Sequence, residues 1–217
     1  MTRLNRIRWL ALLLVGVLTL CGCAPRESEP PETTGDEDGG LVCVQYSRFS
    51  GTFPEDGTGR QVKSVAAILV HNDSGEFLDY ANVTCVIGSE SGTFQVTGLP
   101  PGATAWVLEK DAKTVAADDY FGAMQCEKYS FRSDAVMSTD KLSVKAEGNT
   151  LTVTNQSGKT LKNVCVYYKT VHDDGNYFGG ITYMLNFGNL EPGASAQKQS
   201  SHYGSDSRIV RYSFQES

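Results

Sequence analysis

The chain of 217 residues lacks an apolar run long enough to cross a membrane. Its longest apolar stretch extends over twelve residues from Trp9 to Leu20, whereas a transmembrane helix needs about 20. Arg3, Arg6 and Arg8 precede this stretch. A basic segment followed by a short apolar segment is typical of a secretory signal peptide, so we expect an exported protein.

Positive charge is also scarce. The chain contains 25 acidic and 19 basic residues, and its formal net charge is -6. A chain of this charge is repelled by phosphate backbones and by anionic lipid head groups. We therefore expect no nucleic-acid partner.

The sequence has no catalytic or metal-binding signature. Ser157 to Thr160 are similar to the end of a phosphate-binding loop, but Val153 stands where such a loop requires glycine. A Gly-x-Ser-x-Gly motif is absent, and no Cys or His pairs have the spacing of a zinc site. The run that begins at His172, His-Asp-Asp-Gly-Asn, is most simply a hairpin turn. We expect no catalytic residue, no bound metal and no cofactor.

Two cysteines lie at the end of the apolar stretch. Cys21 and Cys23 could form a metal or redox site, half of a disulfide, or a processing signal. Leu20-Cys21-Gly22-Cys23 resembles the lipobox of bacterial lipoproteins, which has an aliphatic residue three positions before the modified cysteine and a small residue directly before it. The resemblance implies that lipoprotein signal peptidase removes residues 1–22 and that Cys23 is lipidated. The alternative is an ordinary secretory signal, which would leave a soluble protein.

The next segment, residues 24–40, is rich in proline and acidic residues and has no large apolar side chain. Such a segment buries too little surface to fold, so we predict that residues 23–40 form a lipidated N-terminus and a disordered acidic linker. Its span as a flexible chain is roughly 20 to 25 Å. Loss of residues 1–22 removes three arginines and moves the net charge to -9. We expect membrane contact through the lipid on Cys23, with the folded part held away from the bilayer.

From Leu41 onward the chain is rich in Val, Thr, Tyr and Phe, with frequent turn residues and no helical periodicity, which predicts an all-β fold. The segment "TLTVTN" alternates with period two and places Leu151 and Val153 on one face. The chain also contains an internal repeat: "LVHNDSG" at 69–75 returns 83 residues later as "TVTNQSG", and "LPPGATA" at 99–105 returns 91 residues later as "LEPGASA". We predict two tandem immunoglobulin-like β-sandwich domains, residues 41–135 and 136–217.

The second repeat carries a family resemblance. "LTVTNQSGKTLKNVCVYY", followed by "DDGN" and "LEPGASA", resembles the FxLYD family and related immunoglobulin-like modules of bacterial surface lipoproteins. The resemblance covers about residues 141–214 and, more faintly, 63–131. It implies a β-sandwich at the cell surface and no catalytic residues.

Four cysteines follow the linker, an even number that allows three pairings. Cys43 and Cys126 are 83 residues apart and begin equivalent strands, so we predict that they form a disulfide. The alternative is that the cysteines are buried free thiols acting as small apolar side chains.

The second repeat has an insertion within residues 172–189, the densest aromatic stretch of the chain. Tyr177 and Phe178 follow an Asp-Gly turn and precede two glycines, which places them near a hairpin tip. We predict that this pair contacts a partner, because aromatic side chains often dominate interfaces. Tyr183 and Phe187 instead have the spacing of a strand that alternates into the core.

Two functional classes remain. The first is a membrane-anchored, non-catalytic binding or scaffolding lipoprotein at the outer face of the bacterial cytoplasmic membrane, with an envelope protein or cell-wall partner. The second is an envelope enzyme whose site is assembled from residues far apart in the sequence. The absent catalytic motifs favour the first.

Overall fold

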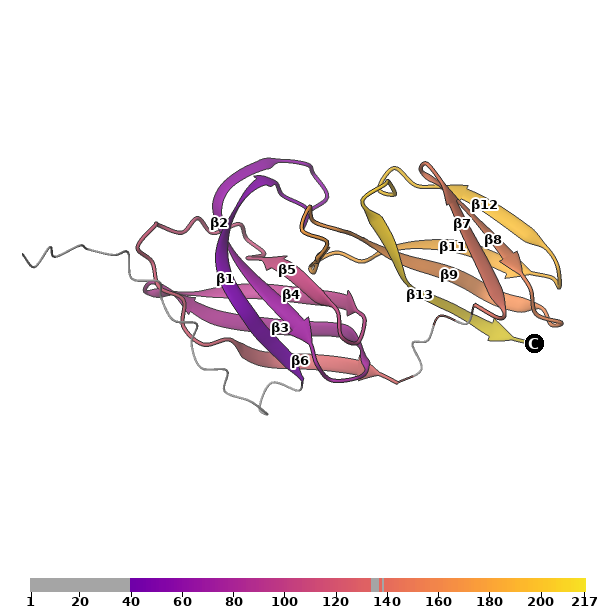
Figure 1. Ribbon diagram of the computed structural model, residues 1–217, viewed down its shortest axis with the longest axis horizontal. Coiled ribbons are helices and arrows are strands. Elements are labelled where there is room, and N and C mark those ends of the chain that lie inside the picture. Colours follow the sequence, from indigo (N-terminus) through magenta and orange to yellow (C-terminus); the bar gives the residue numbers. More distant parts are fainter. Residues whose placement is uncertain (1–39, 134–136, 138) are drawn as a thin grey trace, which may run out of the picture.

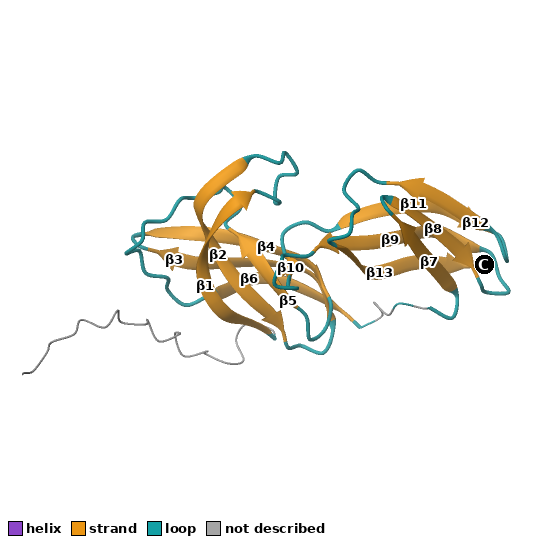
Figure 2. Cartoon of the chain, turned by 45° about the horizontal axis from the view of Figure 1, so that its top comes forward, coloured by secondary structure: helices purple, strands orange, loops and turns teal. Residues whose placement is uncertain are grey.

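The structure, a computed structural model, describes residues 40–133, 137 and 139–217. The predicted signal peptide, the lipidation site Cys23, most of the linker and the predicted boundary between residues 135 and 136 lie outside the described residues. Within the described ranges the chain is all-β, as predicted, and Figure 2 shows only strands and loops. No helix in this part of the chain has the length and apolarity to cross a membrane.

The strands, in chain order, are β1 (Leu41–Thr52), β2 (Gln61–Asn72), β3 (Phe77–Ile87), β4 (Glu90–Leu99), β5 (Thr104–Leu108), β6 (Gln125–Arg132), β7 (Leu142–Glu147), β8 (Thr150–Asn155), β9 (Leu161–Thr170), β10 (Tyr177–Phe178), β11 (Tyr183–Leu190), β12 (Ser195–Gln199) and β13 (Ser207–Glu216). They form two β-sandwiches, which lie end to end along the long axis of the molecule (Figure 1). We call β1 to β6 the first domain and the remaining strands, apart from β10, the second domain.

The first domain packs the sheet β1-β2-β5 against the sheet β4-β3-β6. The alternation along β3 explains this packing. Val83, Cys85 and Ile87 point inward and are buried, whereas Val86, between Cys85 and Ile87, is exposed. A fully buried side chain of this size stabilises the fold by about 1.5 to 3 kcal/mol. The core is completed by residues from the facing sheet, among them Ala66, Ile68, Val70, Ala105 and Val107.

The second domain packs the sheet β12-β8-β7 against the sheet β11-β9-β13. Leu151 and Val153 are both 0% exposed, so the predicted buried face of β8 is confirmed. Val164 and Val166 of β9 face them in the same core. Phe187 of β11 is also buried there, as its strand spacing predicted.

A buried asparagine joins two turns in each domain. Asn72 is 0% exposed, and its Nδ2 donates a hydrogen bond to the carbonyl oxygen of Leu99 over 2.9 Å. Asn155 is equally buried and donates to the carbonyl oxygen of Leu190 over 2.8 Å. These pairs stand at matching places in the two repeats, so the asparagine explains why the Asn-x-Ser-Gly and Leu-x-Pro-Gly motifs recur together.

Candidate functional site at the domain junction

The insertion of the second repeat extends a sheet of the first domain. Strand β10 runs parallel to β5, with Tyr177 opposite Ala105 and Phe178 opposite Trp106. The backbone N–H of Gly179 donates to the carbonyl oxygen of Trp106 over 2.7 Å. The chain between β9 and β11 therefore supplies the fourth strand of the sheet β1-β2-β5-β10. This segment, together with β9 and β13, contacts the first domain. We call this contact region the junction.

Two glycines allow the backbones to approach closely at the junction. A Cβ at Gly179 would lie 2.6 Å from Cγ2 of Val107. A Cβ at Gly98 in β4 would overlap the hydroxyl of Thr182, and the φ of Gly98, +54°, lies in the left-handed region. A side chain at either position would therefore push the domains apart.

The turn before β10 holds a tryptophan of the first domain. Trp106 donates from Nε1 to Oδ2 of Asp174 over 2.7 Å, and His172 Nδ1 lies 3.0 Å from Oδ1 of the same aspartate. Partial burial raises the pKa of Asp174, but hydrogen bonds from Trp106 and Asn176 outweigh it and hold this pKa well below its usual range. The His172 ring packs edge-on against Phe178, with 5.4 Å between ring centroids. The turn is thus a docking element with an ionised carboxylate at its centre.

Lys169, near the end of β9, is the most deeply buried charged residue of the junction, with 0% exposure. Its Nζ donates to the carbonyl oxygens of Thr97 over 2.7 Å, Ile181 over 2.8 Å and Gly179 over 3.0 Å, and to Oγ1 of Thr182 over 3.1 Å. Burial lowers the pKa of Lys169 to about 7, against a smaller opposing effect of Glu55. Hydrogen bonds to oxygens favour the ammonium form, and these acceptors belong to both domains.

Glu55 carries the opposing charge from the long loop between β1 and β2. Its carboxylate accepts a hydrogen bond from the N–H of Leu108 over 3.3 Å and lies so close to Gly180 that a Cβ there would overlap it. Burial raises the pKa of Glu55 to about 7, although the backbone of Leu108 and the charge of Lys169 act in the opposite direction. A loop of the first domain therefore covers the segment that follows β10.

A second polar contact spans the domains through Asp79 of β3. Arg132 of the first domain binds Oδ2 of Asp79 through Nε at 2.7 Å and Nη2 at 2.6 Å. Arg211 of β13, in the second domain, reaches Oδ1 of the same carboxylate with Nη1 at 3.3 Å. The guanidinium of Arg211 also lies over the Tyr167 ring, 4.2 Å from its centroid. One carboxylate is therefore shared by arginines of both domains.

A pocket of about 150 Å³ opens beside this contact. We call it the arginine pocket, and its lining residues are Phe77, Asp79, Thr97, Gly98, Tyr167, Thr182 and Arg211. Four of them belong to the first domain and three to the second. The pocket therefore exists only while the domains are docked.

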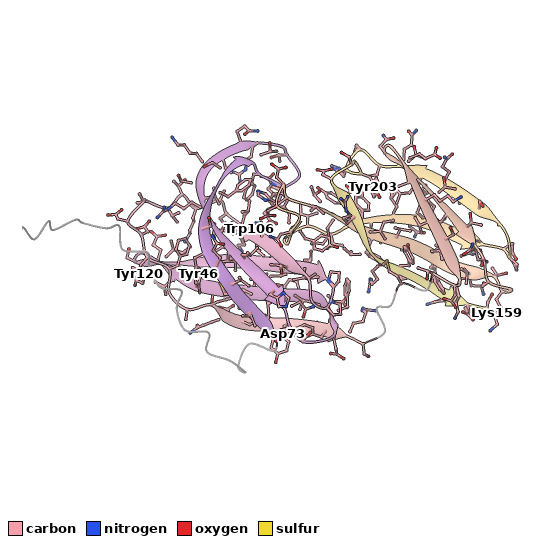
Figure 3. All side chains as sticks on the ribbon, in the orientation of Figure 1. Tyr46, Asp73, Trp106, Tyr120, Lys159 and Tyr203 are labelled. Carbon is pink, nitrogen blue, oxygen red and sulfur yellow. The ribbon has the colours of Figure 1, made fainter. Side chains whose placement is uncertain are left out.

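Aromatic rings extend from the core of the second domain towards its surface. Tyr168 is 1% exposed and stacks on Tyr183 with 5.3 Å between centroids. Tyr183 stacks in turn on His202 at 4.8 Å, and Tyr203 packs edge-on against Tyr168 at 5.0 Å. Figure 3 places Tyr203 at the end of this domain that faces the first domain, with Lys159 at the far end. The stack therefore supports the junction from the second domain.

The residues predicted to contact a partner lie at the junction. Tyr177 and Phe178 are half-buried against the first domain of the same chain. Phe178 also packs edge-on against Phe49 of β1, with 5.9 Å between centroids. A contact of this pair with a second molecule stays a prediction, whereas their contact with the first domain is direct.

The predicted disulfide residues lie in the two sheets of the first domain, Cys43 in β1 and Cys126 in β6. Cys43 is a free thiol whose Sγ donates to the carbonyl oxygen of Gln45 over 3.8 Å, so the bridge is not formed in this structure. Both side chains pack against the first core. Burial raises the pKa of the Cys85 thiol in the same core to about 12. The pairing stays a prediction, which counting free thiols in the exported, denatured protein tests.

No protein-family model matches the chain, and a comparison with curated proteins finds no significant match. The site must therefore be read from its own geometry. In the part of the chain that the structure describes, no cluster of three or more His, Cys, Asp or Glu residues could hold a metal ion. The junction brings together Lys169, Glu55 and Arg211, none of which the sequence analysis identified. The only signal was a lysine at the end of the apolar run "VCVYYK".

Proposed function

We propose that this chain is a lipid-anchored, non-catalytic binding or scaffolding protein of the bacterial cell envelope. One observation carries the proposal. Burial shifts the pKa values of Lys169 and Glu55 to about 7, and both of these groups lie between the two domains and hold them together. Lys169 is fully buried and donates to four oxygens of the chain itself. A substrate cannot reach it, so the group best suited to acid-base chemistry has a structural use.

The anchor belongs to the same proposal. The lipobox resemblance supports lipidation of Cys23, and two acyl chains there would keep the protein at the outer face of the cytoplasmic membrane. The acidic segment that follows supports a flexible tether. The FxLYD resemblance and the two sandwiches support immunoglobulin-like modules presented at the cell surface. A docked pair of domains gives an envelope protein or a cell-wall component a surface of fixed shape.

Metabolic labelling with palmitate tests the anchor. We expect the wild-type chain and the Cys21→Ser variant to be labelled and to fractionate with membranes. We expect the Cys23→Ser variant to be unlabelled and to leave the membrane fraction. Label on Cys23→Ser, or a mature N-terminus that still contains Cys21, would overturn the anchoring proposal. Cys21→Ser is the matched control because it changes the neighbouring thiol only.

Crosslinking of the labelled wild-type protein in its native membrane tests the binding role. We expect one or a few envelope proteins or cell-wall fragments to be captured reproducibly, and fewer by a variant whose junction is broken. Gly98→Val is suited to this purpose, because a side chain at Gly98 would meet Thr182. Equal capture by an undocked variant would show that the fixed arrangement of the domains has no part in binding.

A further inference from the structure

We infer that the edge of β5 that β10 covers is a strand-addition site, and that residues 171–182 of a second copy of the chain can replace the chain's own residues 171–182 there. We call residues 171–182 the docking segment. A second copy is then a partner for the proposed binding role, on which the inference rests.

Without the docking segment, β5 would be an open edge of its sheet. One side of β5 pairs with β2 from Thr104 to Leu108. On the other side, β10 pairs with Ala105 and Trp106 only (Figure 2), and the N–H of Leu108 donates to Oε1 of Glu55 over 3.3 Å. The sequence of β5, "TAWVL", is apolar after its first residue. An apolar strand edge of this kind is a template for an extended segment of another chain.

Three contacts make this edge selective for the docking segment. Nε1 of Trp106 donates to Oδ2 of Asp174 over 2.7 Å, so the edge binds a carboxylate. Phe178 packs edge-on against Phe49, with 5.9 Å between ring centroids. A Cβ at Gly179 would lie 2.6 Å from a side-chain atom of β5, so this position needs glycine. The matching ligand is an extended segment with an acidic residue, an aromatic residue four positions later and a glycine directly after it.

The docking segment also binds the other sheet of the first domain. The N–H of Thr97 in β4 donates to the carbonyl oxygen of Gly179 over 2.8 Å. Oγ1 of Thr97 donates to the carbonyl oxygen of Gly180 over 2.9 Å and lies 2.9 Å from Oγ1 of Thr182. Main-chain groups therefore provide much of the recognition, as they do when a peptide adds a strand to a sheet.

None of these contacts requires that the two domains belong to one chain. In the described part of the chain, the first domain ends with β6 at Arg132 and the second begins with β7 at Leu142. Each contact above joins a residue before this crossing to a residue after it. Two copies that exchange their docking segments fill each other's edges, so the assembly closes as a two-fold dimer. The proposed anchor would concentrate the copies on one membrane surface, which favours the exchange.

A synthetic peptide of residues 171–182 tests the site by fluorescence anisotropy, with the full-length chain in non-ionic detergent. In the wild type the chain's own docking segment competes with the peptide. The variant Tyr177→Ser, Phe178→Ser should leave the edge open and bind the peptide about tenfold more tightly or better, because a larger fraction of the sites is free. Met184→Ser is the matched control, at a side chain that is 53% exposed, and should bind the peptide like the wild type.

Two further peptides test the selectivity of the edge. A peptide with Gly179→Val should bind to the open variant at least about tenfold more weakly, because its side chain would meet β5. A peptide of residues 114–125 contains the same Tyr-Phe-Gly run, at 120–122, but has Ala117 where the docking segment has Asp174. It lacks the carboxylate for Trp106 and should also bind about tenfold more weakly, or worse.

Crosslinking of two differently tagged copies in one membrane tests the exchange without opening the junction. One copy carries a photo-crosslinking phenylalanine analogue in place of Phe49. We expect a species of twice the mass that contains both tags and in which the analogue is joined to residues 171–182 of the other copy. Val44 lies on the same strand and is 51% exposed. The analogue at Val44 is the control and should not join these residues.

Crosslinks from position 49 that stay within one copy, no binding of the peptide by the open variant, or equal binding of the Gly179→Val peptide would overturn the inference. Lipidation and the capture of other envelope components are measured separately. A lipidated chain that captures such a component but does not exchange would defeat the inference and leave the proposed function. An unlipidated chain that exchanges would do the reverse.

Discussion

Lys169 of the second domain donates a hydrogen bond to the carbonyl oxygen of Thr97 in the first domain over 2.7 Å. The same Nζ reaches three further oxygens in residues 179–182. One buried side chain therefore ties together β4, β9 and the segment after β10. The oxygen of Thr97 would lose this charged donor if the domains separated, so the docking of the domains and the burial of Lys169 are energetically coupled.

Replacing Lys169 with methionine should be strongly destabilising. The substitution keeps the apolar stem, but it leaves backbone oxygens without their donor and Glu55 without its nearby positive charge. Removing one partner of a buried charged contact costs about 3 to 5 kcal/mol. Urea unfolding of the full-length variant measures the loss. Lys159→Met is the control, since Lys159 is exposed and its ammonium group pairs with Glu216 on the surface; little change is expected there. A similar small change in Lys169→Met would contradict the coupling.

Glu55 should make stability depend on pH below neutrality. Burial raises its pKa in the folded state to about 7 from 4.5. Between these values the unfolded state loses the proton while the folded state keeps it, so the free energy of unfolding falls as pH rises from 4.5 to 7. The contribution of this one group is about 3 kcal/mol. Above pH 7 it is constant.

The variant Glu55→Gln isolates this effect, because glutamine keeps the shape and the acceptor for Leu108 but does not titrate. Its free energy of unfolding should fall by about 3 kcal/mol less than that of the wild type between pH 4.5 and 7. Lys169 acts in a different range: burial lowers its pKa to about 7, so its contribution changes between pH 7 and 10.5. Parallel pH profiles for the two proteins below pH 7 would count against a buried Glu55.

The buried asparagines allow a test of the repeat. Asn155→Ala removes the donor to Leu190 and leaves backbone groups of two turns unpaired, so we expect a loss of at least about 2 kcal/mol in the free energy of unfolding. Gln156→Ala, at the exposed next position, should have little effect. Asn72→Ala should cost a similar amount in the first domain, since Asn72 makes the equivalent bond to Leu99. A neutral Asn155→Ala would mean that the shared motif has no structural use.

The sequence predicted the parts of the fold that depend on local pattern. Alternation in "TLTVTN" correctly placed Leu151 and Val153 on the buried face. The content of Val, Thr, Tyr and Phe, with frequent turn residues, correctly predicted an all-β fold. The junction was beyond this reasoning. Burial of Lys169 depends on oxygens such as that of Thr97, 72 residues earlier, and sequence periodicity carries no information on such distant contacts. The immunoglobulin-like assignment of the two sandwiches stays a prediction.

The aromatic pair of the insertion provides the last test, because its two proposed roles predict opposite results. Tyr177 and Phe178 pair with β5 and are half-buried against the first domain, so replacing both with serine should cost about 2 to 4 kcal/mol of stability, somewhat less than truncation of fully buried aromatic residues. It should also separate the domains, which small-angle X-ray scattering detects as a longer and more variable molecule. Met184→Ser, at a side chain that is 53% exposed, is the control and should change neither measurement. Unchanged stability and shape, with loss of partner capture, would instead show that the pair contacts a second molecule and that the two domains are held by Lys169 and Arg211 without it.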